Sequence, residues 1–446
     1  MTTRRSSFHI ITLGCAKNLV DSRTMAYYLY QAGFIEQEKR RMANYVIINT
    51  CGFIHDARAE SMKAIKSSIN HKRPGQKVIV TGCLSERLRE DLIKQAPGID
   101  GMIGTRDLSA IRKIVESFEN APLAKKLLLG LDRFCICDNP NVPASAIQGS
   151  SAYLKIADGC RRNCAFCAIP AIKGPLISRA KDSILRDALY LQSQGVNEIN
   201  LIAQDVTDYQ HDLQQPDGLA NLLEYILPQL SQVPWIRLLY TFPGSVSPRL
   251  IDLLADKNQL LPYLDIPLQH ADPTVLQAMA RPFDMNWVRD TVNNLRYRVP
   301  ELCLRTTFIV GYPNETEKSF NILLDFIQEI QFDHVGVFTY SCEQGTPAEK
   351  LGDPISSATK ERRKADLMAI QASISLQKNQ AFIGKTMDLL VEGSDPTNNV
   401  VVGRTWRNAP EIDGFVIATG KAEVGSLKKV RLTAAMEHDF YGNLIN

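Results

Sequence analysis

The stretch DGCRRNCAFCAIP, Asp158 to Pro170, places three cysteines at positions 160, 164 and 167 of one short loop. Thiolate is a soft ligand that suits zinc, copper(I) and iron-sulfur clusters. Each iron at a cluster corner takes one thiolate, so three cysteines would leave one iron of a four-iron cluster open. The loop follows the apolar run AYLKIA (152–157), which is typical of a strand. We therefore predict a metal-binding loop at the carboxyl end of a strand.

Structural zinc and a redox dithiol are the alternatives at this loop. A structural zinc site takes four ligands, and no fourth cysteine or histidine stands beside these three. Cys164-Ala-Phe-Cys167 is a C-x-x-C pair, but it does not open a helix after a thioredoxin-like strand and leaves Cys160 without a role. Structural zinc therefore remains the alternative to an iron-sulfur cluster at this loop.

Apolar runs that alternate with helical patterns surround the loop and predict a curved or closed parallel sheet. In such a sheet the functional loops lie at the carboxyl ends of the strands. Helices are expected near 183–194 and 316–330. The expected strands are AYLKIA (152–157), EINLIA (198–203), WIRLLY (235–240), YLDIPL (263–268), CLRTTFIVG (303–311) and HVGVFTY (334–340).

The first third of the chain predicts a second site built from three separate cysteines. Cys15, Cys51 and Cys83 each follow a β-branched apolar run, at intervals of 36 and 32 residues. Each interval accommodates one crossover helix and the next strand, so the runs predict a second parallel sheet, with helices from about Ser22 and Ala57. Because open parallel sheets bind ligands outside the carboxyl ends of their strands, these cysteines can converge.

The remaining four cysteines show no such regularity, and we expect them to be structural. They are Cys135, Cys137, Cys303 and Cys342.

Composition indicates an ordinary soluble globular protein, with 45% apolar and 22% charged residues in a chain of 446. The apolar run from Phe8 to Leu13 is interrupted by His9 and is too short for a signal peptide. No stretch approaches the roughly 18 apolar residues of a membrane-spanning helix. We therefore expect a cytoplasmic chain without membrane contact, in which cysteines serve as ligands or catalysts more readily than they form disulfides.

Changes in composition along the chain predict three domains. Residues 139–151 are rich in Pro, Gly, Ser and Ala and lack charge, which is typical of a linker. A charged helix is expected over 359–380, followed by short strands with glycine-bearing turns that predict a small all-β barrel. The expected limits are an N-terminal βα parallel-sheet domain at 1–140, a linker at 141–151, a βα domain at 152–383 and the barrel at 384–446.

Several motifs together resemble the radical S-adenosylmethionine methylthiotransferases, across nearly the whole chain. The cysteine loop with Phe166 before its last cysteine resembles the cluster loop of radical S-adenosylmethionine enzymes. The closest resemblance is to the RimO-type branch, which modifies an aspartate of small-subunit ribosomal protein twelve. The other motifs are LGCAKNLVDS (13–22), NTCGFI (49–54), VTGCL (80–84), LDIPLQHA (264–271), FIVGYPNETE (308–317) and APEIDG (409–414).

This resemblance implies two 4Fe-4S clusters and S-adenosylmethionine as cofactors. The cluster on Cys160, Cys164 and Cys167 would cleave the cofactor to a 5'-deoxyadenosyl radical. An auxiliary cluster, on Cys15, Cys51 and Cys83, would carry the sulfur. The resemblance further implies a radical SAM partial (β/α)6 barrel in the centre, an OB-like TRAM domain at the C-terminus and a low-potential electron donor of the flavodoxin or ferredoxin type.

Four further residues are expected to contact the cofactor. Phe166 would cover the cluster and the adenine, and Gln204 and Arg305 would meet polar groups of the cofactor. Gly311 would let the backbone approach closely. Their positions at strand ends carry this expectation.

The charge of the predicted barrel bears on the substrate. Residues 385–446 hold seven Lys and Arg against eight Asp and Glu, whereas a barrel that grips RNA phosphates would be basic. The charge therefore favours a basic ribosomal protein as substrate and leaves direct nucleic-acid binding open. The competing hypotheses are a tRNA adenosine methylthiotransferase of the MiaB type and a non-enzymatic protein with structural zinc.

Overall fold

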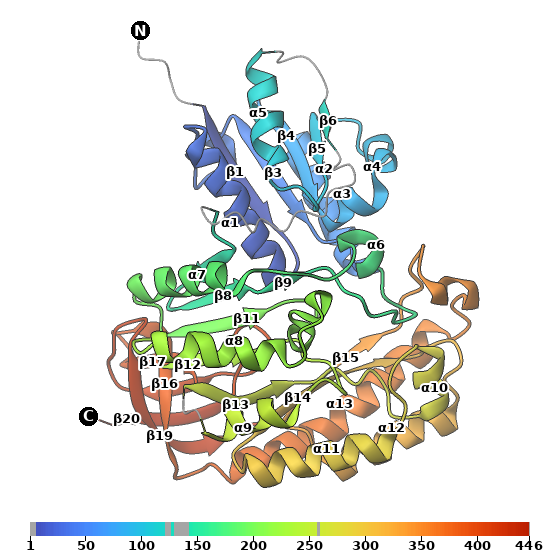
Figure 1. Ribbon diagram of the computed structural model, residues 1–446, viewed down its shortest axis with the longest axis vertical. Coiled ribbons are helices and arrows are strands. Elements are labelled where there is room, and N and C mark those ends of the chain that lie inside the picture. Colours follow the sequence, from blue (N-terminus) through green and yellow to red (C-terminus); the bar gives the residue numbers. More distant parts are fainter. Residues whose placement is uncertain (1–5, 121–125, 129–141, 257–258, 446) are drawn as a thin grey trace.

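The computed structural model describes residues 6–120, 126–128, 142–256 and 259–445. An N-terminal domain lies above a larger central domain, and a small barrel lies against one side of the central domain near the carboxyl terminus (Figure 1). Within the described ranges, no helix is long and apolar enough to cross a membrane. Cys135 and Cys137 lie outside the described residues.

The N-terminal domain is a six-stranded parallel sheet with strand order β2-β1-β3-β4-β5-β6. Its elements are β1 (Ser7–Thr12), α1 (Ala16–Gln31), β2 (Ile35–Glu36), η1 (Arg40–Met42), β3 (Tyr45–Thr50), α2 (His55–Asn70), β4 (Lys77–Gly82), α3 (Cys83–Leu88), α4 (Glu90–Gln95), β5 (Gly101–Ile103), α5 (Ala110–Asn120) and β6 (Lys126–Leu128). The three predicted strands are β1, β3 and β4. They lie next to one another, so their carboxyl ends share one edge of the sheet.

Helix α1 begins at Ala16 rather than near Ser22, where the sequence pattern placed its start. Ala16 and Val20 are buried in a cluster with residues of the central domain, such as Tyr153. The first turns of α1 thus pack on the central domain. Their sequence does not show the apolar spacing expected of a helix that packs on its own sheet. This contact holds the residues after Cys15 against the central domain.

The central domain is a seven-stranded open sheet with order β15-β14-β13-β12-β11-β8-β7, in which the six predicted strands run parallel. Its elements are β7 (Ser145–Gln148), β8 (Ser151–Lys155), β9 (Ala157–Asp158), α6 (Ile169–Lys173), β10 (Ile177–Ser178), α7 (Lys181–Ser193), β11 (Glu198–Ile202), η2 (Val206–Asp208), η3 (His211–Leu213), α8 (Gly218–Ile226), η4 (Leu227–Gln229), β12 (Trp235–Leu238), α9 (Pro248–Asp256), β13 (Leu260–Asp265), α10 (Pro273–Ala278), α11 (Met285–Arg298), β14 (Cys303–Val310), α12 (Glu317–Ile330), β15 (His334–Thr339) and η5 (Pro347–Leu351). The sheet is therefore the predicted partial barrel.

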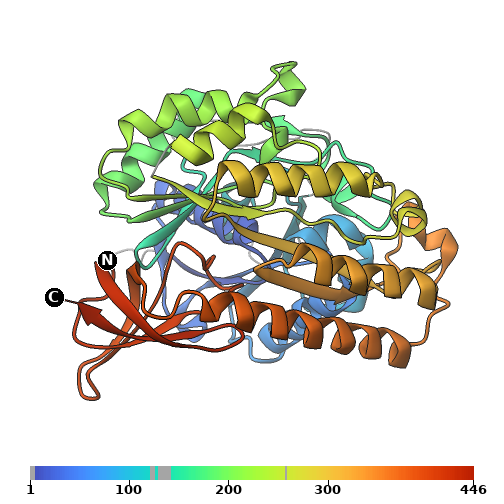
Figure 2. The same cartoon turned by 90° about the horizontal axis from the view of Figure 1, so that it is seen from below.

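Helices cover the outer face of this sheet (Figures 1 and 2). In α12, for example, the Thr316 hydroxyl accepts a hydrogen bond from the Ser319 amide at 3.1 Å, which caps the helix. Phe320, Leu323 and Ile327 of the same helix follow the three-four spacing of a buried stripe and lie in the main core.

The segment expected to be a linker contains a strand. Residues 145–148 form β7, which pairs antiparallel with β8 at the edge of the central sheet. Ala146 of this strand and Ala144, which precedes the strand, are buried. The run is too short and too rich in small residues to show a strand pattern, and it is the pairing with β8 that orders it.

The C-terminal domain is a closed five-stranded barrel with order β16-β17-β18-β20-β19, as predicted. Its strands are β16 (Thr386–Asp395), β17 (Val400–Arg404), β18 (Val416–Thr419), β19 (Leu427–Ala435) and β20 (Phe440–Ile445), and α13 (Ser357–Gln380), the last helix of the central domain, precedes them. Helix α13 runs along the central domain and leads into the barrel (Figure 2). The buried Glu198 carboxylate on β11 accepts hydrogen bonds from Arg237 at 2.8 Å and from Arg404 of the barrel at 2.6 Å, which joins the two domains.

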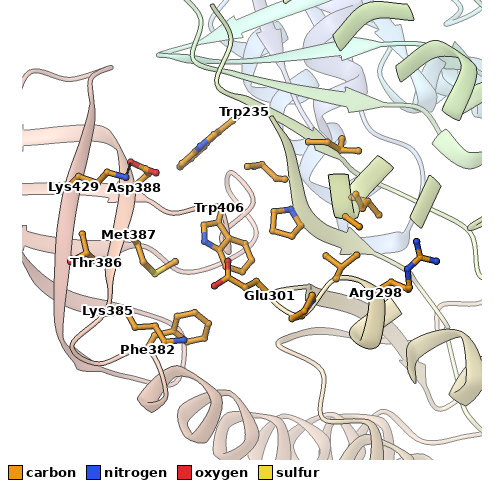
Figure 3. Close-up of a pocket in the computed structure, with 17 residues that line it drawn as sticks. Trp235, Arg298, Glu301, Phe382, Lys385, Thr386, Met387, Asp388, Trp406 and Lys429 are labelled. Atoms are coloured by element: carbon orange, nitrogen blue, oxygen red, sulfur yellow. Dashed lines mark ion pairs between the residues drawn. The ribbon is translucent and has the colours of Figure 1, made fainter. Parts of the chain in front are cut away.

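A cavity of about 460 Å³ lies at the seam between the barrel and the central domain (Figure 3). Trp235 and Trp406 face it, and an ion pair of 2.8 Å between Lys429 and Asp388 lies on its barrel side. The cavity opens at the amino ends of β12 and β13. None of the six predicted cysteine ligands lines it.

Candidate active site with two cysteine triads

All six predicted cysteine ligands line one cavity of about 440 Å³ between the N-terminal and central domains. The two predicted sites thus face one shared space, as the chemistry implied by the family resemblance requires. Among the other residues that line this active-site cavity are Lys17, Asn18, Phe53, Arg162, Phe166, Ile169, Gln204, Tyr240, Phe242, Gln269, Arg281 and Phe338. The two triads are therefore placed to act on one substrate.

The loop after β1 brings Cys15 close to Cys51 because Gly14 lies between the strand and the cysteine. Gly14 has a φ of +90°, and a Cβ atom built on it would lie 2.7 Å from the Cys51 Cβ and 3.1 Å from its Sγ. Only glycine allows both this backbone conformation and this approach. Cys51 is fixed from the other side by Ser61, whose hydroxyl accepts from the Cys51 amide at 3.1 Å and donates to its carbonyl at 2.8 Å.

Cys83 is the most buried member of this first triad, with 7% of its surface exposed. It is the first residue of α3, and its Sγ lies 3.9 Å from the Oδ1 of Asn18 on α1. Burial raises the pKa of the Cys83 thiol to about 12 and also raises the pKa of Cys51. A metal centre bound here must therefore displace thiol protons.

The second triad receives hydrogen-bond donors at each sulfur. The backbone N–H of Arg162 donates to the Cys160 Sγ at 3.4 Å, and that of Ile169 donates to the Cys167 Sγ at 3.5 Å. The Arg281 guanidinium lies 3.6 Å from the Cys164 Sγ. Such donors stabilise thiolate sulfur, as in iron-sulfur proteins. Burial raises the pKa of Cys160 to about 11 and of Cys167 to about 12, so here too metal binding displaces protons.

The arrangement within each triad fits a cluster better than a zinc ion. Among the described residues, no group of three or more His, Cys, Asp or Glu side chains is placed to hold a single metal ion. Zinc draws all its ligands to one point, with about 2.3 Å to each sulfur. The thiolates of a cluster bind different irons and so lie farther apart. Each triad brings three thiols to the cavity, one short of the four ligands of a structural zinc site but enough for a four-iron cluster with one open iron.

Two of the four residues expected to contact the cofactor line the active-site cavity. Phe166, which stands between Cys164 and Cys167 in the sequence, lies in the wall of the cavity. Gln204 donates from its Nε2 to the Asp158 carboxylate at 2.8 Å, and its buried Oε1 has no hydrogen-bond partner among the described residues. A free buried acceptor in the wall fits a ligand with a donor group, such as the amino group of S-adenosylmethionine.

Arg305 and Gly311 do not line the cavity. Arg305 stands near the start of β14 and pairs with Asp265 at 3.0 Å and with Asp413 of the barrel at 3.4 Å. Gly311 has a φ of +77°, and a Cβ atom there would lie 2.3 Å from the Lys360 side chain. Arg305 therefore takes part in a contact between domains, and Gly311 in packing against Lys360. The position at a strand end does not distinguish these roles from contacts with a ligand.

Comparison with known proteins gives the same family along the whole chain. The "Ribosomal protein uS12 methylthiotransferase RimO" of Roseiflexus sp. (strain RS-1) is 40% identical over 458 residues, which cover 98% of this chain and 97% of that one. The protein of the same name from Microcystis aeruginosa (strain NIES-843 / IAM M-2473) is 40% identical over 434 residues and covers 97% of this chain and 98% of its own. The chain belongs to the RimO family. The resemblance inferred from its motifs is thereby confirmed.

Three family models match successive parts of this RimO-family chain. They are described as "Uncharacterized protein family UPF0004" over residues 7–104, "Radical SAM superfamily" over 154–327 and "TRAM domain" over 383–445. A radical S-adenosylmethionine methyltransferase, TsrM from Kitasatospora setae, has a similar fold, with a TM-score of 0.56, 13% identity and coverage of 78% of this chain and 77% of its own. The predicted fold class is confirmed by these matches.

A buried cluster of charges, not foreseen from the sequence, joins the two triads of this RimO-family chain. Asp21 on α1 pairs with Lys173 at 2.8 Å and also with Lys155. Both lysines pair in turn with Asp158, which begins the second cysteine loop, at 3.1 Å from Lys155 and 3.4 Å from Lys173. Burial alone would raise the pKa of Asp158, but the two ammonium groups and Gln204 outweigh it and the pKa is lowered.

Two strained residues also line the cavity and were not predicted. Tyr240 has a φ of +65° and Gln269 a φ of +77°, conformations that L-residues rarely adopt. Such strain gathers at functional sites, where it aims a side chain. Tyr240 ends the expected strand WIRLLY, so the strand-end argument applied to all six strands would have found it.

Proposed function

We propose that this chain adds a methylthio group to the β-carbon of an aspartate in small-subunit ribosomal protein uS12. The observation that carries the proposal is the single cavity lined by both cysteine triads. RimO relatives that match nearly the whole chain bear the name of this activity.

We infer that Cys160, Cys164 and Cys167 hold one 4Fe-4S cluster and that Cys15, Cys51 and Cys83 hold the auxiliary one. The first cluster with S-adenosylmethionine supplies radical chemistry that can remove an unactivated hydrogen, which no acid-base side chain does at neutral pH. The auxiliary cluster is the sulfur carrier. Each triad provides three sulfur ligands that face the cavity.

The chain's own side chains then position the reactants and shield them from water. Phe166 and the free Gln204 Oε1 are proposed to hold the cofactor beside the second triad. Phe53, Phe242 and Phe338 give the cavity largely apolar walls. Walls of this kind exclude water and so protect a reactive intermediate from side reactions. Arg305 and Gly311 have no part in this proposal.

Two further parts of the proposal concern the partner and the domain limits. A donor of the flavodoxin or ferredoxin type would deliver the single electrons that a low-potential cluster needs. We place the domains at 1–140, 152–383 and 384–446 and assign 145–151 of the predicted linker to the edge of the central sheet, because residues 145–148 pair with β8.

Metal analysis after anaerobic reconstitution tests the site assignment. The unaltered chain should bind about eight irons and about eight acid-labile sulfides, corresponding to two four-iron clusters. A chain with Ala at positions 160, 164 and 167 should retain about four irons, and so should one with Ala at positions 15, 51 and 83. Stoichiometric zinc without labile sulfide would contradict the proposal.

A further inference from the structure

Lys17 extends an ammonium group into the active-site cavity from the first turn of α1. It lies two residues after Cys15, on the side of the first triad. Its Nζ donates to the Ala203 carbonyl at 3.3 Å and lies 3.5 Å from the centre of the Tyr240 ring. An ammonium group has three donors, so these contacts leave it with donors to spare for a ligand.

Within the described ranges, Lys17 has no carboxylate partner. The neighbouring buried lysines differ, since Lys155 and Lys173 each pair with both Asp21 and Asp158. Arg281 also lacks a carboxylate partner in the described part of the chain, but its guanidinium faces the Cys164 sulfur at 3.6 Å. Asp158 and Asp265 favour the charged form of Lys17 from a distance, but a cation in an apolar cavity with no carboxylate in direct contact is costly. Lys17 is therefore suited to an anionic group of a ligand.

The aromatic ring beneath Lys17 is held there by a strained backbone. Tyr240 follows β12 with a φ of +65°, and its carbonyl accepts a hydrogen bond from the Val206 amide at 3.0 Å. This conformation turns the Tyr240 ring toward the ammonium group. A cation over a ring face is stabilised by the π electrons yet keeps its charge for a third partner. The strain and the contact together indicate a position built for binding.

We propose that Lys17 binds the side-chain carboxylate of the substrate aspartate. This proposal rests on the function proposed above and names the group that recognises the substrate. The carboxylate is one bond from the β-carbon, so a residue that holds the carboxylate also sets the position of the carbon that gains sulfur. Lys17 lies beside Cys15, on the side from which the auxiliary cluster would deliver the sulfur. The Lys17 ammonium also lies near Gln204, through its bond to Ala203, so the test below includes the affinity for the cofactor.

The test compares Lys17→Met with the unaltered holoenzyme and with Lys181→Met as a matched control. Lys181 lies on the protein surface, and its Nζ is 4.6 Å from the centre of the Tyr225 ring, so it makes the same kind of contact away from the cavity. The probes are two peptides that copy the uS12 loop, one with the target aspartate and one with asparagine in its place. Fluorescence anisotropy gives the peptide Kd, and turnover gives KM and kcat.

Lys17→Met should weaken binding of the aspartate peptide about tenfold or more and raise its KM accordingly, since it removes a charged hydrogen bond. It should also abolish the preference for the aspartate peptide over the asparagine peptide. Iron content, the Kd of S-adenosylmethionine and 5'-deoxyadenosine formation should match those of Lys181→Met.

Three results would overturn the proposal. One is unchanged binding of the aspartate peptide by Lys17→Met. Another is a weaker affinity for S-adenosylmethionine with peptide binding unchanged, which would assign Lys17 to the cofactor. The third needs no variant: equal binding of both peptides by the unaltered holoenzyme. Failure of the unaltered enzyme to methylthiolate the aspartate peptide would instead contradict the proposed function.

Discussion

Gly14→Ala tests whether the close approach of the loops after β1 and β3 is what assembles the first triad. Both Gly14, with a φ of +90°, and Gly33, with a φ of +85°, adopt the left-handed conformation. An L-residue there costs roughly 1–2 kcal/mol. Nothing lies within 4 Å of a Cβ atom on Gly33, whereas one on Gly14 would meet the Cys51 Cβ at 2.7 Å. Gly33→Ala is therefore a control with the same backbone strain and no clash.

The size of the clash decides the expected result. Carbon atoms in ordinary contact are about 3.5–4.0 Å apart, so the Gly14 loop must move away from Cys51 by about 1 Å. Metal–ligand distances tolerate only about 0.2 Å. Gly14→Ala should therefore lose the auxiliary cluster and fall from about eight irons to about four. Gly33→Ala should lower stability by the same roughly 1–2 kcal/mol and keep both clusters.

The assay is anaerobic reconstitution followed by iron and sulfide determination, with 5'-deoxyadenosine and methylthiolated peptide as the two products. Gly14→Ala should still form 5'-deoxyadenosine, because the second triad lies on another loop, but should not form the methylthio product. Retention of about eight irons and full methylthiolation by Gly14→Ala would refute the argument.

Substitutions in the two triads, substitutions of paired aspartates and a change of pH have distinct expected outcomes. Cys164→Ala should abolish 5'-deoxyadenosine formation, whereas Cys51→Ala should leave part of it and stop sulfur transfer; full methylthiolation by Cys51→Ala in a reconstituted enzyme would remove that residue from the auxiliary site. Asp21→Asn removes the negative charge that two buried lysines share. It should destabilise the contact between the N-terminal and central domains by about 3 kcal/mol or more. Limited proteolysis and thermal unfolding measure this effect. Asp91→Asn breaks the exposed ion pair between Asp91 and Lys94 and should affect stability much less. Equal effects of Asp21→Asn and Asp91→Asn would contradict the role of the buried charge cluster in the domain contact. Burial raises the pKa of Cys83 to about 12, so its thiol is protonated at neutral pH and iron binding must release that proton. Iron loading of the metal-free chain should therefore rise between about pH 7 and pH 9, and loading that falls over this range would contradict the sign of the shift.

Most of the fold was predictable because its signals are local. The runs that form β1, β3 and β4 are apolar and β-branched; Cys51 and Cys83 directly follow β3 and β4, and Cys15 lies three residues after the end of β1. In a parallel sheet this order alone brings Cys15, Cys51 and Cys83 to one edge. Strand β7 lies within the predicted linker, because only its pairing with β8 orders it.

The parts of the site that depend on contacts between domains could not be predicted. Asp21 and Lys155 are 134 residues apart, and neither shows a pattern that links it to the other. Arg305 has the sequence position of a cofactor contact, yet Asp413 from the barrel pairs with it. The role of Lys17 depends on Tyr240, which only the packing of the N-terminal domain on the central sheet brings beneath it.

The most direct test of the central claim is mass spectrometry of two candidate substrates after anaerobic turnover by the reconstituted enzyme. One is ribosomal protein uS12, or a peptide that copies its loop, and the other is tRNA. We predict the gain of one methylthio group on the β-carbon of an aspartate in the protein and no change in the tRNA. A methylthio group on tRNA adenosine, with the protein unmodified, would contradict the substrate proposed here and leave the two cysteine triads in place.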